Sequence, residues 1–107
     1  MISNKDNKRI GELMRAIMVL KTSSEARRFF RDLLTEKELI EFGNRWKAAR
    51  MLAEKISYTK IEKETGLSST TVARVSKWLN SGKNGYKLIL NRINHHKHLL
   101  REENGCG

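Results

Sequence analysis

At 107 residues, with 38% hydrophobic and 32% charged residues, the chain has the size of one small domain and enough apolar residues for a core, which excludes a disordered chain. Its 22 lysines and arginines face 12 acidic residues, and a net charge of +10 favours polyanionic partners. No apolar run approaches the ~20 residues that span a bilayer, and residues 1–10 are too polar for a secretory signal. We therefore expect a cytoplasmic protein without a membrane partner. The single Cys106, which has no partner in its own chain, also fits a reducing compartment.

The N-terminal third predicts two amphipathic helices, over residues 5–21 and 25–34, with a capping residue among Thr22, Ser23 and Ser24. Apolar residues in the first helix gather on one face: Ile10, Leu13, Met14, Ile17 and Met18. Short helices in a small chain have little else to cover such a face. We expect residues 5–34 to form a homodimer interface, with burial inside one chain as the alternative.

A long central helix is predicted over residues 36–55. Thr35 and Glu38 have the spacing of a capping box, in which each residue satisfies a backbone N–H of the other. Its buried stripe is expected to be Leu39, Phe42, Trp46, Ala49 and Leu52 or Ala53. Without any proline, the whole chain has a helical pattern and the predicted fold class is all-α, with about six helices.

Residues 57–80 have the pattern of a helix-turn-helix. Ser57 is placed to cap the first helix and Ser68 or Ser69 the second, while Gly66 suits the left-handed position after a helix. The apolar residues of this segment lie where the two helices must pack on each other: Ile61, Leu67, Val72, Val75 and Leu79.

Burial of those apolar residues turns a slim polar and basic face of the second helix outward. This face consists of Ser69, Thr70, Ala73, Arg74 and Lys77. Such short side chains fit the major groove, where they reach base edges or the thymine methyl group. Thr59, Lys60 and Lys83 are expected at phosphates, and Ser68 completes the predicted DNA-binding set. The stretch from Arg74 to Arg101 contains seven basic residues and no acidic one.

A last helix is predicted over residues 86–98, followed by a polar tail over residues 99–107, so that residues 1–94 form the DNA-binding domain. His95, His96 and His98 lack an acidic or cysteine neighbour at a ligand spacing, so we expect a solvated tract and no metal site. Trp46 and Trp78 are interpreted as packing residues. No catalytic set is apparent, and we do not expect an enzyme.

Three segments in this order resemble the Trp repressor family, and most closely its Trp-repressor-related branch: Leu33-Leu34-Thr35-Glu36-Lys37-Glu38-Leu39 with Arg45, Ser57 to Asn80, and Gly85-Tyr86-Lys87-Leu88. The resemblance covers roughly residues 25–93. It implies an interwoven all-helical homodimer that presents two helix-turn-helix units to a palindromic operator. The expected function is that of a sequence-specific transcriptional regulator, most simply a repressor.

In that family the corepressor lies between the central helix and the recognition helix, with an arginine from each. Arg45 and Arg74 match these arginines, and Thr35 matches a position beside them. Val75 and Trp78 stand where tryptophan-binding members have small residues, and their bulk would crowd an indole. We therefore expect a different small ligand or none, and no cofactor.

Two other functions compete with this interpretation. A non-specific nucleoid or replication-associated protein would also bind duplex DNA through basic residues. An RNA-binding or protein-interaction module would reuse the same helices. RNA recognition usually relies on exposed aromatic residues or a basic sheet, which the sequence does not indicate.

Overall fold

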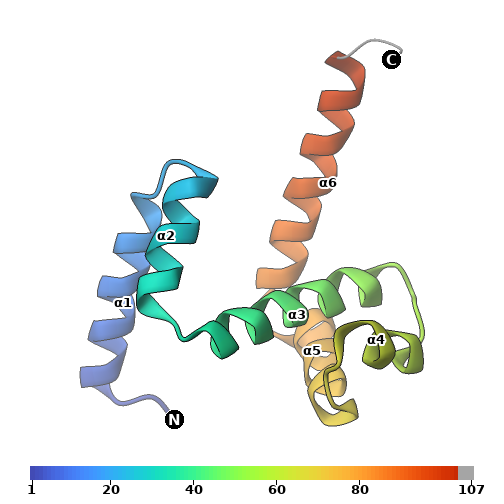
Figure 1. Cartoon of the computed structure of the whole chain (residues 1–107), viewed down its shortest axis with the longest axis horizontal. Helices are drawn as coiled ribbons and strands as arrows, with labels where there is room; N and C mark the ends of the chain where they lie inside the picture. The colour runs from blue at the N-terminus through green and yellow to red at the C-terminus, as the bar shows by residue number, and fades with distance from the viewer. Residues whose placement is uncertain (104–107) are drawn as a thin grey trace. The chain divides into compact units, whose positions relative to one another are not determined.

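The computed structural model describes the backbone of residues 1–103 and the side chains of residues 1–95. In this part of the chain all regular structure is helical (Figure 1). The helices are α1 (Asn4–Met18), α2 (Ser23–Leu33), α3 (Glu36–Ala53), α4 (Tyr58–Thr65), α5 (Ser69–Ser81) and α6 (Gly85–Glu103). The all-α prediction is confirmed. None of these helices is both long and apolar enough to cross a membrane.

Local hydrogen bonds account for where the helices begin. The hydroxyls of Thr22, Ser57 and Ser68 each accept a backbone N–H three residues later, at 3.1, 3.3 and 3.1 Å. At the start of α3, the Thr35 hydroxyl accepts the Glu38 N–H at 3.1 Å and the Glu38 carboxylate accepts the Thr35 N–H at 2.9 Å. The predicted caps and capping box are therefore present.

The helix ends differ from the predicted ones by a few residues. Helix α1 ends at Met18 rather than at residue 21. Helix α3 ends at Ala53 rather than at residue 55, because Lys55 takes a left-handed conformation with φ 65°. Helix α6 continues to Glu103, beyond its predicted end at residue 98. Residues 99–103 are Leu, Leu, Arg, Glu and Glu, which are all good helix formers. Polarity alone was therefore a poor signal for the end of this helix.

The chain divides into two compact units, and the first is Met1–Leu39. Within it, α1 and α2 form a helical hairpin (Figure 1). Neither helix contains a buried residue. Ile10, Met14 and Met18 on α1 are 39%, 48% and 80% exposed. The unit thus carries an apolar surface that its own helices leave uncovered.

The second unit begins at Ile40 and contains the hydrophobic core. In it, α4 packs on α5, and α5 contacts α6. The core joins α3 to the two helices of the helix-turn-helix through Ala48, Ala49, Met51, Ile61, Val72 and Val75. Ala48 and Ala49 are completely buried, and their single methyl groups let the larger side chains of α4 and α5 lie close to α3.

The predicted buried stripe of α3 is only partly correct. Ala49 is buried, and Leu39, Trp46 and Leu52 are half-buried, but Phe42 is 48% exposed and Ala53 is exposed. Ala48 and Met51 are buried instead. The reason is that α4 and α5 cover the carboxyl-terminal half of α3 from the side on which Ala48 lies, and helical periodicity by itself does not say where a covering helix will sit.

Candidate nucleic-acid interface

The turn between α4 and α5 is held by one glycine and one hydroxyl. Gly66 has φ +74°, a conformation that disfavours side chains, and its N–H donates to the Glu62 carbonyl at 2.8 Å. The buried Thr65 hydroxyl donates to the Ile61 carbonyl at 2.7 Å and accepts the Leu67 N–H at 3.2 Å. Gly66 is predicted from the sequence and Thr65 is not, although a hydroxyl directly before such a glycine is a usable signal.

Helix α5 presents one face to the core and the opposite face outward. Val72 and Val75 are completely buried and Leu79 is 7% exposed. Each residue of the predicted recognition face is exposed: Ser69, Thr70, Ala73, Arg74 and Lys77. Because none of them is bulky apart from the flexible arginine and lysine, the exposed side of α5 is narrow enough for a major groove.

The predicted phosphate-contacting residues lie around this helix in the same unit. Thr59 and Lys60 are exposed in the first turn of α4, and Lys83 is exposed after the end of α5. Ser68 is exposed, but its hydroxyl already accepts the Thr71 N–H and lies 3.0 Å from the Thr71 hydroxyl. Ser68 is therefore foremost the N-cap of α5.

The basic residues of this unit are largely uncompensated. Within residues 1–95, ion pairs join Arg31 to Glu36 at 4.0 Å and Arg45 to Glu41 at 2.7 Å. Neither pair involves Lys60, Arg74, Lys77 or Lys83. Their positive charge thus remains available to an anionic partner.

Two of the three residues expected around a corepressor, Arg45 and Thr35, make local contacts. Arg45 is bound by Glu41, and its guanidinium lies 5.8 Å from the centre of the Phe42 ring. The Arg45 Nε atom is buried and has no hydrogen-bond partner among the described side chains. Thr35 is engaged in the capping box of α3, and Arg74 is exposed on the recognition face.

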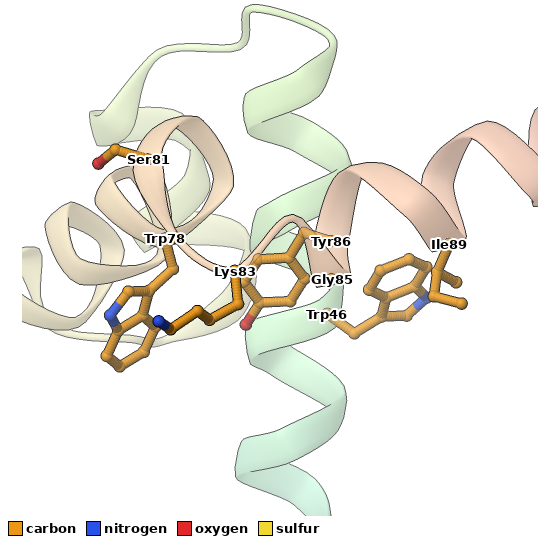
Figure 2. Close-up of a pocket in the computed structure, with 8 residues that line it drawn as sticks. Trp46, Trp78, Ser81, Lys83, Gly85, Tyr86 and Ile89 are labelled. Atoms are coloured by element: carbon orange, nitrogen blue, oxygen red, sulfur yellow. The ribbon is translucent and has the colours of Figure 1, made fainter.

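An open pocket of about 770 Å³ lies where α3, the end of α5 and the start of α6 meet (Figure 2). Trp46 and Tyr86 stack there with ring centres 6.3 Å apart and an interplanar angle of 28°. Trp78, on α5, is 46% exposed. The sequence indicates packing roles for both tryptophans. It does not predict the pocket, because the lining residues are distant in sequence.

The histidine tract lies at the limit of the described side chains. His95 is exposed, whereas the side chains of His96 and His98, and all of Cys106, lie outside the described residues. In the described part of the chain, no group of three or more histidine, cysteine or acidic residues is arranged to hold a metal ion.

The fixed turn, the buried apolar side of α5 and its slim exposed side define a helix-turn-helix protein. The sequence model described as Trp repressor protein matches residues 8–94. The chain belongs to the Trp repressor family, which consists of helical DNA-binding regulators and not of enzymes.

Similar proteins agree with this assignment. The chain is 42% identical over 86 residues to Uncharacterized protein YerC of Bacillus subtilis (strain 168), a match that covers 80% of this chain and 83% of that protein. The crystal structure of a TrpR-like protein from Eubacterium eligens ATCC 27750 superimposes with a TM-score of 0.78 at 36% identity, over 81% of this chain and 90% of the other. A Trp repressor candidate from Staphylococcus aureus gives a TM-score of 0.77 at 36% identity, over 81% and 87%.

Proposed function

We propose that this protein is a sequence-specific transcriptional repressor that acts in the cytoplasm and binds a palindromic operator as a homodimer. Family membership supports the coarser part, a helical DNA-binding regulator. The finer part of the proposal, sequence-specific binding, rests on one observation: one side of α5 is buried and the opposite side is exposed. Val72 and Val75 are completely buried in the core, while Thr70, Ala73 and Arg74 are all exposed.

The exposed residues suit different tasks. Arg74 has the donor geometry to bind the O6 and N7 atoms of a guanine, and the Ala73 methyl suits contact with a thymine methyl. Thr70 lies one residue after Ser69 in the first turn of α5, the part of a recognition helix that reaches base edges. Lys60, Lys77 and Lys83, together with the Thr59 hydroxyl, are assigned to phosphates.

A homodimer is supported by the uncovered apolar face of α1, because a monomer would leave Met14 and Met18 in water. Two recognition helices related by a twofold axis require half-sites one helical turn apart, about 34 Å. The proposed operator is therefore a palindrome with fixed spacing.

Selection of bound fragments from random duplex DNA tests this proposal. The expected result is a palindromic consensus, and insertion of about five base pairs between its halves should abolish cooperative binding, since the second half-site then faces the opposite side of the duplex. Selection without any consensus would contradict sequence-specific binding and favour the non-specific duplex binder. Retention of single-stranded or structured RNA alone would favour the RNA-binding module.

Variants then separate base contacts from phosphate contacts. Arg74→Ala and Thr70→Ala should each cost about 1–3 kcal/mol on the selected operator and relax base preference. Lys60→Ala is the matched comparison, and it should weaken operator and random DNA alike. Equal losses on both DNAs for Arg74→Ala would refute its assignment to a base.

We further propose that operator binding does not require tryptophan. Arg45 is already bound to Glu41, and Val75 adds its side chain to the core where tryptophan-binding members of the family have a small residue. Titration of the operator complex in the absence and presence of saturating L-tryptophan should give the same Kd. A large gain in affinity would instead support a corepressor held by Thr35, Arg45 and Arg74.

A further inference from the structure

We propose that Asn84 and Gly85, in the link between α5 and α6, form a site of spontaneous covalent modification. At this site the Asn84 carboxamide is converted into a carboxylate without an enzyme, and the added negative charge weakens binding to DNA. The modification itself is independent of the proposed function, whereas its effect on DNA affinity rests on that function.

The reaction needs only these two residues and water. The Gly85 backbone nitrogen attacks the Cγ atom of the Asn84 side chain, and a new C–N bond closes a five-membered imide ring. The bond from Cγ to the side-chain nitrogen breaks, and ammonia leaves with the proton of the backbone nitrogen. Water then opens the ring at either carbonyl, which gives aspartate or isoaspartate. Both products carry a carboxylate in place of the neutral amide.

Both reacting groups are free in the structure. Asn84 and Gly85 are exposed. Gly85 is the first residue of α6, so its N–H has no acceptor within the helix. The Asn84 main-chain carbonyl accepts the Leu88 N–H at 3.1 Å, but no hydrogen bond within the described residues holds the Asn84 carboxamide. The attacking nitrogen and the attacked carbon therefore have no contact to lose.

The backbone of the link explains the choice of these residue types. Asn84 has φ 67°, a left-handed conformation that asparagine tolerates better than most side chains. Gly85 is not required by its surroundings, because its φ is not left-handed and an added Cβ atom would meet nothing within 4 Å. The missing side chain instead leaves the Gly85 nitrogen unshielded, which favours cyclisation.

Asn80 provides a contrast only four residues earlier. Its side-chain nitrogen donates to the Ser76 carbonyl at 2.9 Å. The following residue, Ser81, lies inside α5, where a backbone N–H is bound to the carbonyl four residues before it. Cyclisation at Asn80 would have to break both contacts. We therefore expect Asn80 to keep its amide while Asn84 loses it.

The modification places a negative charge directly after the exposed Lys83, which is assigned to a phosphate. The stretch from Arg74 to Arg101 contains no acidic residue, so this carboxylate would be its first. Repulsion from phosphates should weaken binding to DNA. The effect of an aspartate on the fold has the opposite sign, because a carboxylate before the first residue of a helix interacts favourably with the helix dipole. Weaker binding without lower stability thus distinguishes the charge from local unfolding.

Peptide mapping by mass spectrometry tests the modification in the full-length protein after incubation in warm, mildly alkaline buffer. Asn84 should gain the mass of an amide-to-acid conversion, and Asn80 should not. Gly85→Ala is the matched variant, because its methyl group has room in the structure but shields the attacking nitrogen. It should slow the conversion severalfold. An Asn84 that converts no faster than Asn80, or an unchanged rate in Gly85→Ala, would overturn the proposal. Asn104-Gly105, a second pair of this type, lies outside the described residues, and its peptide is quantified separately.

Freshly prepared Asn84→Asp tests the consequence for DNA. It should bind duplex DNA more weakly than the wild type by about two- to fivefold at each half-site, the range of one exposed charge pair, while its Tm is not lowered. Fresh Gly85→Ala should bind like the wild type. Equal affinity of Asn84→Asp and the wild type would refute the effect on DNA. If the fresh wild type does not bind duplex DNA, the proposed function fails, whereas the peptide map still decides whether Asn84 is modified.

Discussion

Two expectations of different kinds apply to Thr35. Family resemblance places it beside a ligand, whereas its spacing to Glu38 predicts a capping box. In the structure both its hydroxyl and its N–H are hydrogen-bonded to Glu38. These contacts lower the pKa of the Glu38 carboxyl below its ordinary value of 4.5, chiefly through the hydrogen bond from the Thr35 backbone N–H.

This lowered pKa predicts a pH-dependent contribution to stability. A carboxyl with a lower pKa in the folded state stabilises the fold above its unfolded pKa, and this contribution is lost as the pH falls through the folded value. Glu38→Gln should therefore lower the Tm at neutral pH and lose that deficit in acid below about pH 4.5. Thermal unfolding against pH measures this, with Glu64→Gln in the last turn of α4 as the control. A deficit that persists unchanged in acid would contradict the assigned contact.

At the scale of elements, the helix-turn-helix depends on a backbone conformation that one residue type adopts without strain. Gly66→Ala forces a Cβ atom into a left-handed position and should destabilise the protein by about 1–2 kcal/mol. Gly43→Ala, inside α3 and with nothing within 4 Å of the added methyl group, should instead stabilise it by about 0.5–1 kcal/mol. Chemical denaturation of both variants checks the opposite signs. Equal effects would mean that the turn tolerates a side chain at Gly66.

For the whole molecule, the exposed face of α1 predicts self-association. Met14→Glu should convert the dimer into a monomer, since a charge on a buried apolar interface leaves an unpaired ion without water. Arg9→Glu, on the same helix and exposed, is the control for added negative charge and should leave the dimer intact. Light scattering at micromolar concentration measures the mass. A wild-type monomer would contradict the prediction outright.

The charge of the whole molecule predicts how binding depends on salt. If the dimer neutralises about 6–10 phosphates, its operator affinity should fall by a factor of about 10³ to 10⁵ between about 50 and 200 mM salt. The double substitution Lys77→Ala, Lys83→Ala removes phosphate contacts and should make the log–log slope shallower. If the log–log slope of the wild-type protein is near zero, the excess positive charge does not contact phosphates and is only a solvated surface.

The sequence by itself determined the features that depend on neighbouring residues. Helix starts can be predicted at Ser57, at Ser68 and at the Thr35–Glu38 pair, because a capping hydroxyl accepts the backbone N–H of the residue three positions later. Gly66 predicts the turn because the left-handed backbone conformation depends on the residue type at that position. The two sides of α5 follow from a helical repeat, which assigns Val72 and Val75 to one side and Arg74 to the other.

The tertiary structure alone decided which helix faces are covered and what they enclose. Periodicity groups Phe42 with Ala49, yet Phe42 is exposed because α4 and α5 reach only part of α3. The pocket appears only when α6 brings Tyr86 onto Trp46, and no local signal connects two residues so distant in sequence. A helical repeat depends on contacts within a few residues, whereas a cavity depends on which segments meet in space.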